Sequence, residues 1–518
     1  MPACGDSLTD EEIAAVLAYI KSTWPAQSAH RDPLMSVEKE ETTMPHHDHP
    51  GWLTRRAFLA CGGLGLALLP VWARALAAPD QAPLRLRPEP TRLSVHPEVP
   101  EVQGAWGYNG EIPGPVLSYR QGERLHVTLE NGLEQPTTIH WHGIRLPNAM
   151  DGVPHVTQAP VRPGERFEYA FDLPDAGTYW YHPHLNGSEQ LARGLVGALV
   201  VEEPEPYPVD RELLWVLDDW RLTREGRISE HFDDSHDMSH GGRVGNTVTV
   251  NGRMPHDLHV RPGERLRLRL INAANARIFS LSFGDLPVHV IALDGQPVAP
   301  HEPEGGKLVI GPAMRADLVV DCTGDTGRVM NIRDDFYPGM DFTVMRLAWR
   351  GKPVRNASPG APPPPLPRNP VPEPVLQGAE RQEIAFGGGM MGSQGMREMM
   401  RMMRQGMAWT VNGKPVHSPG RHDHPPLFTL QRGTTCRIVY RNDTAWHHPI
   451  HLHGHHFRVL NRNGSPEPHQ PLRDTVLMNP RETVETAFVA DNPGDWMLHC
   501  HILEHQAGGM TGLIRVRA

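Results

Sequence analysis

Three copies of one short unit constrain the fold of this chain more than any other feature of its sequence. Each copy opens with an Asn-Gly pair in a context typical of a β-hairpin turn, at Asn109-Gly110, Asn251-Gly252 and Asn412-Gly413. A glycine turn and a run of alternating apolar and polar residues follow, and these runs begin at Gln121, Arg261 and Gln431. A repeated unit made only of strands and turns predicts three related β-sandwich domains.

Length and composition agree with this prediction. A chain of 518 residues is too long for one core. Its 50 glycines and 52 prolines suit many short strands joined by turns. We predict an all-β chain of three Greek-key β-sandwich domains, at 78–203, 204–355 and 376–518, with a stiff Pro-rich linker at 356–375. We expect a monomer, although the sequence leaves the oligomeric state open.

Charge and cysteine content exclude two classes of protein. The formal net charge is -10 and no basic stripe is present, which argues against nucleic-acid binding. Five cysteines are too few for a disulfide-dense scaffold. Cys322 and Cys436 could pair, but both stand in strand-like runs far apart in sequence. We expect two buried free thiols.

The first 43 residues do not fit the rest of the chain. An apolar stripe of Ile13, Val16, Leu17 and Ile20 predicts an amphipathic helix that resembles the C-terminal end of a c-type cytochrome. The chain contains no Cys-x-x-Cys-His motif, so it cannot attach such a haem. We interpret 1–43 as extraneous, derived from an adjacent or fused coding region or from a mis-assigned start; a functional segment is the alternative.

An export signal is predicted at 44–77. Arg55-Arg56 precede an apolar run that is too short to span a bilayer, and a small-x-small cleavage site follows at Ala75-Leu76-Ala77. The paired arginines resemble a twin-arginine signal, which exports proteins that have already folded. We therefore expect a mature periplasmic protein that is not held in the membrane.

One strand near the C-terminus can serve two metal centres. Side chains alternate along a strand, so His499 and His501 share one face while Cys500 points to the other. On the far side Cys500 can meet His505 and Met510, and two imidazoles, a thiolate and a weak axial thioether are typical of a blue-copper electron-transfer site. A buried structural thiol among scattered histidines, or a zinc site, is the alternative.

Three other segments supply further imidazoles at the same spacing. Four His-x-His pairs, two near each end of the mature chain, can surround a cluster of three metal ions. His448 is then left over to complete the site at Cys500. The pairs are His140 with His142, His182 with His184, His451 with His453, and His499 with His501.

At these residues the chain resembles the multicopper oxidases, the laccase-like family, over essentially all of the mature protein. The resemblance implies three cupredoxin domains, four copper ions and dioxygen as electron acceptor. It implies a type 1 copper on His448, Cys500, His505 and Met510, and a type 2 copper on His140 and His451. It implies one type 3 copper on His142, His182 and His501, and the other on His184, His453 and His499.

Protons are needed as well as electrons, because reducing dioxygen to water takes four of each. Asp151 matches an acidic position that in relatives lies beside the copper cluster and assists proton delivery; a turn residue is the alternative. Relatives in the copper-efflux group carry glutamate directly after the last histidine of the fourth segment, and this chain has Gln506 there. Glu504 or a water chain are the remaining candidates, and we predict catalytic roles for Asp151, Cys500 and Glu504.

A methionine-rich segment at 390–407 suggests the electron donor. Soft thioethers favour Cu(I), and the segment resembles the Met-rich insert of periplasmic cuprous oxidases. A short helix from Gln394 with methionines on several sides would form a lid that captures Cu(I); a flexible apolar cover over the substrate cleft is the alternative. The histidines of His231 to His240, with Met238, could bind copper loosely or belong to a solvated loop. The methionines are Met390, Met391, Met396, Met399, Met400, Met402, Met403 and Met407.

The sequence therefore predicts an oxidase that couples oxidation of Cu(I), of phenols or of other small organic donors to reduction of dioxygen, in defence against copper. A laccase for organic donors without a role in copper tolerance is one alternative. A copper-binding protein without turnover is another. A copper nitrite reductase is the second choice on fold, but it needs fewer histidine pairs.

Overall fold

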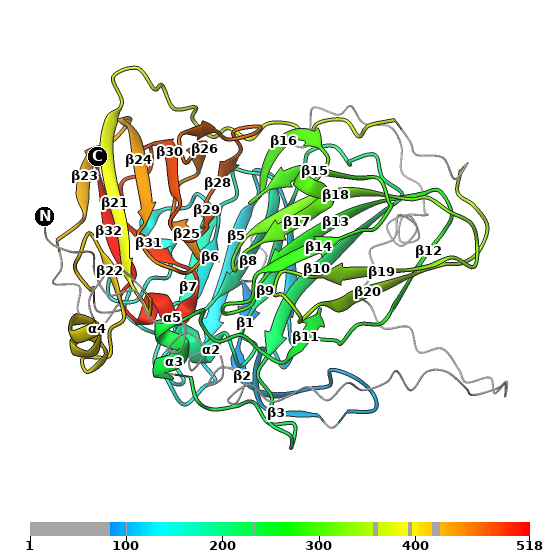
Figure 1. Cartoon of the computed structure of the whole chain (residues 1–518), viewed down its shortest axis with the longest axis horizontal. Helices are drawn as coiled ribbons and strands as arrows, with labels where there is room; N and C mark the ends of the chain where they lie inside the picture. The colour runs from blue at the N-terminus through cyan, green and yellow to red at the C-terminus, as the bar shows by residue number, and fades with distance from the viewer. Residues whose placement is uncertain (1–82, 100, 233, 356–360, 392–395, 417–424) are drawn as a thin grey trace, which may run out of the picture. The chain divides into compact units, whose positions relative to one another are not determined.

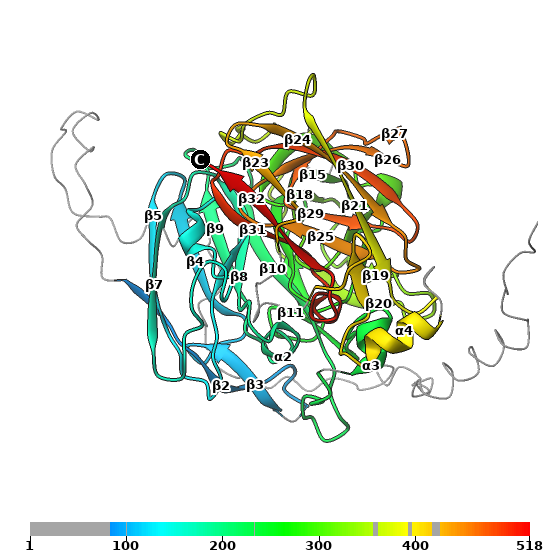
Figure 2. The same ribbon diagram turned by 90° about the vertical axis from the view of Figure 1, so that its left-hand side faces the viewer.

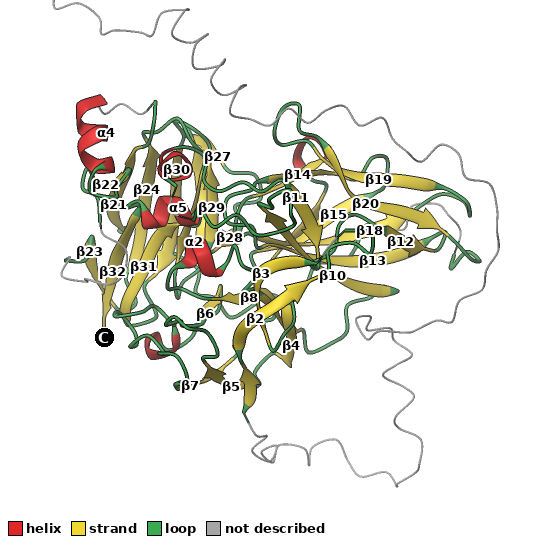
Figure 3. Ribbon diagram, turned by 90° about the horizontal axis from the view of Figure 1, so that it is seen from below, coloured by secondary structure: helices red, strands yellow, loops and turns green. Residues whose placement is uncertain are grey.

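The computed structural model describes residues 83–99, 101–232, 234–355, 361–391, 396–416 and 425–518. The segments 1–43 and 44–77, which the sequence marks as extraneous and as an export signal, lie outside these ranges. Strands dominate the described residues and the helices are short (Figure 3). The predicted all-β fold class of three cupredoxin-like sandwiches is confirmed. In the described ranges, no helix has the length and apolarity to cross a membrane.

The strands of the first domain form two small sheets and a hairpin (Figure 1). One sheet has the order β1-β5-β7 and the other β4-β9-β8-β6, while β2 pairs with β3. The elements are β1 (Leu84–Leu86), β2 (Pro88–Leu93), β3 (Val102–Tyr108), β4 (Gly114–Arg120), β5 (Arg124–Glu130), β6 (His140–His142), η2 (Asn148–Met150), β7 (Arg166–Asp172), β8 (Gly177–His182), α2 (Gly187–Gln190) and β9 (Gly197–Glu202).

The second domain is a sandwich of a six-stranded and a five-stranded sheet. Their orders are β11-β10-β13-β18-β15-β16 and β12-β20-β19-β14-β17. The elements are β10 (Arg211–Trp220), α3 (Ser235–Ser239), β11 (Thr247–Val250), β12 (Asp257–Val260), β13 (Glu264–Asn272), β14 (Phe279–Ser282), β15 (Val288–Leu293), β16 (Gln296–His301), η3 (Glu304–Gly306), β17 (Lys307–Ile310), β18 (Arg315–Cys322), β19 (Val329–Asp334) and β20 (Phe342–Trp349).

The third domain repeats this arrangement. Its sheets have the orders β22-β21-β24-β30-β26-β27, with β28 beside β26, and β23-β32-β31-β25-β29. The elements are β21 (Glu380–Gly388), α4 (Met396–Met403), β22 (Trp409–Val411), β23 (Phe428–Gln431), β24 (Thr435–Asn442), β25 (His448–Leu452), β26 (Phe457–Arg462), β27 (Ser465–Pro466), β28 (Leu472–Arg473), β29 (Thr475–Met478), β30 (Thr483–Val489), β31 (Gly494–Cys500), α5 (Leu503–Ala507) and β32 (Thr511–Arg517).

The three Asn-Gly pairs all form the same two-residue turn. Asn109, Asn251 and Asn412 have φ of 56°, 51° and 51°, and the glycine that follows each is also at positive φ, as a type I′ turn requires. The asparagine amide then ties the turn to an earlier strand: Asn251 Oδ1 accepts from Val216 N at 2.8 Å, and Asn412 Oδ1 accepts from Ala385 N at 2.8 Å. Asparagine tolerates this backbone and supplies the bond, which explains its recurrence.

The apolar cores show which domains share an interior. Buried residues of the first and third domains, among them Trp141, Tyr181, Ile450 and Trp496, belong to one continuous cluster. The second domain is built mainly around a cluster of its own. In Figure 1 the cyan strands β6 and β8 accordingly lie beside the orange and red strands β25 and β31.

The described part of the Pro-rich linker contains no helix or strand and is bound along the first two domains. Asn369 donates to Ala176 O at 2.8 Å and to Gln296 Oε1 at 3.1 Å. Tyr207 Oη donates to Pro364 O at 2.6 Å. The linker therefore holds a defined course across both domains.

Candidate metal centre

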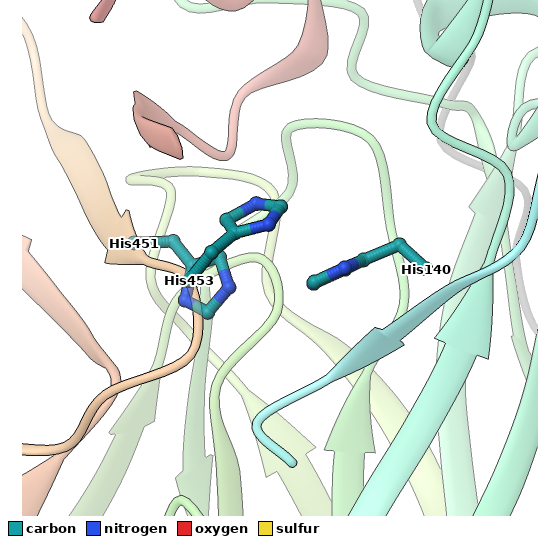
Figure 4. Close-up of side chains that lie close together, drawn as sticks. All are labelled: His140, His451 and His453. Atoms are coloured by element: carbon teal, nitrogen blue, oxygen red, sulfur yellow. The ribbon is translucent and has the colours of Figure 1, made fainter. Parts of the chain in front are cut away.

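Two pairs of strands bring the four His-x-His motifs together. In the first domain β6 and β8 are antiparallel, with His140 opposite His182. In the third domain β25 and β31 are antiparallel, with His451 opposite His499 and Ile450 opposite Cys500. Residues directly opposite each other share a sheet face, so each strand pair presents its imidazoles on one side. Figure 4 shows His140 facing His451 and His453 across the site.

All eight histidines form one buried cluster. Each is at most 5% exposed. Rings from opposite ends of the chain lie against each other: the centroids of His140 and His453 are 3.9 Å apart, and those of His142 and His451 are 3.7 Å apart. His182 and His501 are 5.1 Å apart, and His184 and His499 are 5.2 Å apart. The site therefore exists only where the first and third domains meet.

The ring nitrogens fit a group of metal ions. Six of the eight rings keep at least one buried nitrogen without a hydrogen-bond partner among the described residues. The other two, His453 and His499, point their Nε2 atoms at each other at 3.1 Å. Orphaned buried polar atoms are costly in a folded protein, so this many in one place indicates ligands for a bound group. The six rings are His140, His142, His182, His184, His451 and His501.

The opposite ring nitrogens are held by the protein, as in most metal-binding histidines. His140 Nδ1 and His451 Nδ1 donate to backbone carbonyls of Asp151 and Asp474 at 2.8 and 3.0 Å. His182 Nδ1 and His499 Nδ1 also donate to backbone carbonyls. These bonds fix the tautomer, leaving Nε2 of each ring for a ligand.

Burial favours the neutral form of most of these imidazoles, which is the form that binds metal. Loss of hydration lowers the pKa of each affected ring well below its ordinary value, and the neighbouring rings lower it further. The pKa of His142 is lowered in the same way, although its bond to Asp474 opposes the effect. Neutral imidazole is a preferred ligand of copper.

The second centre surrounds Cys500. Its Sγ lies 3.5 Å from His448 Nδ1 and 3.6 Å from His505 Nδ1, and these two nitrogens are 3.1 Å apart. The remaining nitrogens are anchored: His448 Nε2 to Thr444 Oγ1 at 2.8 Å, and His505 Nε2 to His240 O at 2.7 Å. Met510 is fully buried, and its carbonyl accepts from Cys500 N at 3.1 Å.

The thiol of Cys500 also points to a metal. Burial raises its pKa far above the ordinary value, so a thiolate at this position requires a cation beside it. Cys500 ends β31 between His499 and His501, and its side chain meets His448 and His505 while its two neighbours join the cluster of eight. The peptide backbone around Cys500 therefore links the two centres.

Sequence reasoning missed a carboxylate that organises the eight-histidine cluster. Asp474 Oδ1 lies 3.2 Å from His142 Nε2, and Arg315 of the second domain binds both oxygens of Asp474, at 2.8 and 2.6 Å. Burial alone would raise the pKa of Asp474, but Arg315 and the histidines hold it well below its usual range. The only local signal is a single acidic residue before the β29 strand, which predicts nothing by itself.

Asp151, predicted to serve proton delivery, touches two of the histidines. Its Oδ2 lies 2.8 Å from His453 Nδ1 and its Oδ1 lies 3.3 Å from His140 Nδ1. The other candidate, Glu504, is also buried, but it faces the second domain: its carboxylate accepts from Arg243 N and Asn275 Nδ2, both at 3.1 Å. Burial raises the pKa of Glu504. Gln506 is buried beside it on α5.

The methionine-rich segment forms the helix α4 and its flanks. Met390, Met399, Met400 and Met403 line one cavity. Met402 and Met407 are buried, while Met391 is 61% exposed. The eighth predicted methionine, Met396, begins α4, and its side chain lies outside the described atoms.

Cys322 and Cys436 are both buried and unpaired. Cys322 ends β18 in the second domain and Cys436 lies in β24 of the third. Burial raises the pKa of each thiol to about 12. They are structural thiols within apolar cores.

Comparison with known proteins identifies the class that this fold and these centres define. Three family profiles described as multicopper oxidase match residues 91–206, 211–331 and 394–518. The multicopper oxidase MmcO of Mycobacterium tuberculosis is 30% identical over 457 residues, which cover 82% of this chain and 85% of MmcO. Copper resistance protein A of Pseudomonas syringae pv. tomato is 27% identical over 606 residues, 88% of this chain and 96% of its own.

A solved structure gives the same result. The crystal structure of a multi-copper oxidase from Pseudomonas thermotolerans superposes with a TM-score of 0.75 at 36% identity, covering 84% of this chain and 99% of the other. This chain belongs to the multicopper oxidase family. It is an oxygen-reducing oxidoreductase, and its clustered histidines are typical of the copper sites of that family.

Proposed function

We propose that this oxidase couples the one-electron oxidation of Cu(I), and of phenolic or other small organic donors, to the four-electron reduction of dioxygen to water, and that it serves copper tolerance. The observation that carries the choice of donor is the cluster of four methionines around one cavity, on a segment bound to the Cys500 centre. The segment is joined to the chain beside this centre through Ala408 and Trp409, whose backbone N–H groups both donate to Gly508 O, at 2.8 and 2.9 Å.

The residues present would hold four copper ions. His448, Cys500, His505 and Met510 would hold the type 1 ion; His140 and His451 the type 2 ion; and the other six histidines of the cluster the two type 3 ions. When bound there, copper would supply one-electron redox chemistry at Cys500 and the reduction of dioxygen among the eight histidines. Over one cycle four Cu(I), one dioxygen and four protons give four Cu(II) and two waters.

The chain's own groups arrange this chemistry. The covalent path from Cys500 to His499 and His501 is short and rigid, because β25 and β32 bind β31 on both sides. Burial excludes bulk water from the cluster and keeps the rings in one geometry. Asp151 contacts His140 and His453, so we assign it the holding and delivery of protons at Oδ1 and Oδ2. Glu504 is the second candidate, reached from the side of the second domain.

The cellular setting is part of this proposal. The Arg55-Arg56 signal supports export in the folded state to the periplasm. The similarity to copper resistance protein A supports a role in copper tolerance. A laccase for organic donors alone is the alternative within the family, and a copper-binding protein without turnover is the alternative outside it.

Oxygen consumption by the copper-loaded protein, with Cu(I) as the only reductant, tests turnover. No consumption would contradict Cu(I) oxidation, and a protein that also consumed no oxygen with a phenol would be a binding protein.

A matched set of variants tests the role of the methionines. Deleting 390–407 would also remove buried Met402 and Met407, so we choose Leu at the cavity positions, a change that nearly conserves volume. Replacing Met390, Met399, Met400 and Met403 by Leu should raise KM for Cu(I) relative to a phenol by about 10-fold or more, a loss of roughly 1.4 kcal/mol of binding. Met402→Leu is the control. Equal changes for both donors would contradict a Cu(I)-specific role.

A further inference from the structure

A cavity of about 270 Å³ lies between α3 of the second domain and α4 of the third. In Figure 2 the two helices lie side by side at the edge of the described structure. Four methionines line one side of the cavity, and Ser235, His236, Ser239 and His240 line the other. No Asp, Glu, Lys or Arg among the described residues lines it. A cavity of this composition suits neither an anion nor a hard cation, which prefers carboxylate and carbonyl oxygens.

The two histidines present usable nitrogens to the cavity. Their rings stack with centroids 4.0 Å apart. His240 Nδ1 is engaged by His236 O at 2.9 Å and by Ser239 Oγ at 3.0 Å, so Nε2 is the ring atom left for a ligand. His236 is exposed and can reach the same space. Imidazole and thioether together form a soft donor set, which is the kind that selects Cu(I).

The helix α3 is a built element rather than a loose loop. Asp234 caps it, accepting from His236 N at 2.8 Å and from Asp237 N at 3.2 Å. Arg221 then holds Asp237 with two hydrogen bonds. The histidines therefore face α4 from a fixed support, which the sequence alone did not distinguish from a solvated loop.

Three consecutive carbonyls of α3 and its C-terminal end hold the third domain around the Cys500 centre. Met238 O accepts from Trp409 Nε1 at 2.6 Å. Ser239 O accepts from Met390 N at 2.8 Å. His240 O accepts from His505 Nε2 at 2.7 Å. The residue that offers an imidazole to the cavity is thus bonded directly to a histidine of the Cys500 centre.

We propose that His236 and His240 of the second domain supply nitrogen ligands for Cu(I) in this cavity, beside the sulfur atoms of Met390, Met399, Met400 and Met403. The inference rests on the proposed Cu(I) oxidation and names the residues that perform the capture. A docked Cu(I) loses one electron and leaves as Cu(II); the electron passes through His240 and its hydrogen bond to His505, and four such events balance one dioxygen and four protons.

The test uses Ag(I), a redox-inert analogue of Cu(I), so that binding is measured apart from turnover. Copper-loaded wild-type protein is compared with the His236→Ala/His240→Ala double variant and with His231→Ala, an exposed histidine of the same segment that does not line the cavity. Isothermal titration calorimetry gives the Ag(I) affinity. X-ray absorption spectroscopy at the silver edge gives the numbers of nitrogen and sulfur atoms bound to Ag(I).

We expect wild-type protein and His231→Ala to bind Ag(I) through both nitrogen and sulfur. The double variant should bind at least about 10-fold more weakly and lose the nitrogen neighbours. A shell of sulfur alone in wild-type protein, or an unchanged affinity in the double variant, would overturn the inference. Should the double variant fail to fold, the single variants His236→Ala and Met399→Leu decide the matter, by loss of nitrogen and of sulfur neighbours respectively.

Failure of the proposed function gives a different result. Wild-type protein that binds Ag(I) through nitrogen and sulfur but consumes no oxygen with Cu(I) would contradict Cu(I) oxidation while leaving the docking site in place. Wild-type protein that oxidises Cu(I) but binds Ag(I) without nitrogen would leave the function and remove the assigned histidines.

Discussion

The second and third domains have the same strand order in both of their sheets, yet only the third carries the Cys500 centre. Strands β14 and β19 of the second domain occupy the places of β25 and β31 in the third. Where Ile450 lies opposite Cys500 in the third domain, Leu281 lies opposite Asp334 in the second. The equivalent backbone position thus carries a thiol in one domain and a carboxylate in the other.

The surroundings differ in the same way. Asp334 accepts from Ser280 N at 2.7 Å and from Phe336 N at 3.2 Å, so its role is to satisfy backbone groups. Phe279, fully buried, opens β14 as His448 opens β25. The second domain therefore forms the same sandwich without the thiol and imidazoles that the third domain carries at these positions. The Cys500 centre is a local set of side chains on an architecture that both domains share.

The largest effect is expected from removing the thiol. Cys500→Ser should reduce oxidase activity by more than about 100-fold and abolish the thiolate-to-copper absorption. Substituting a residue that only supports a metal ligand already lowers metal affinity or activity by about 10- to 100-fold, and Cys500 is predicted to be a ligand itself. Cys322→Ser, in the second domain, is the matched control: it should keep the absorption and lose only stability, since it buries a hydroxyl. A Cys500→Ser protein with wild-type oxidase rate would contradict the assignment of the centre.

The next largest effect is expected from a carboxylate in the third domain, compared with a carboxylate in the second. Asp474→Asn should lower copper content or oxidase rate by about 10- to 100-fold, because the Asp474 carboxylate lies 3.2 Å from His142 Nε2 and 3.4 Å from His451 Nδ1 and orients both rings. Asp334→Asn should change thermal stability without changing copper content. Copper per chain and turnover, measured for both variants, separate the two cases; equal copper content in Asp474→Asn and wild-type protein, with equal turnover, would contradict the role of Asp474.

Acid should destabilise the copper-free protein through the first and third domains. Among described residues, every fully buried histidine lies there. In the folded state, burial lowers the pKa of His455 and of His456 to about 4, so below a pH of about 6.5 the unfolded chain binds more protons than the folded one. Stability should therefore fall as the pH drops from about 6.5 to about 4. Chemical denaturation across this range measures it, and a flat profile would contradict buried neutral rings.

The smallest effect is expected from the Asn-Gly turns, where substitution should lower stability equally in the second and third domains. Asn251→Ala and Asn412→Ala each place alanine at φ of 51° and remove the side-chain hydrogen bonding to an earlier strand, at a cost of about 1–2 kcal/mol in the free energy of unfolding. The matching Gly variants should cost less, since glycine adopts this backbone freely. Denaturation midpoints for the four variants test this. A cost confined to one domain would contradict equivalent turns.

Much of the fold and of the clustering of the candidate site could be predicted from sequence because both follow local rules. Asn-Gly turns mark hairpins, and the i, i+2 spacing of histidines on a strand places two rings on one face. The contact between the first and third domains could be inferred only from the family resemblance, because no local sequence pattern indicates which strands of different domains lie together. The helix predicted from Gln394 is described as α4 (Met396–Met403), while Gln394 itself lies outside the described residues.

The residues that were missed act over long distances or through the backbone. Asp474 acquires its role from Arg315, which lies in another domain. The carbonyls of Met238, Ser239 and His240 leave no signature in the side-chain pattern, because any residue supplies the same group. The contacts between α3 and the Cys500 centre therefore follow from the folded structure and not from the sequence of α3.

The division of the eight rings between the first and third domains has a consequence for assembly. Each metal ion bound between such rings would cross-link the first and third domains. Because the rings come together only when both domains are folded and in contact, copper binding would add to the stability of that contact. Loss of the ions should therefore weaken the contact between the first and third domains before any single sandwich unfolds.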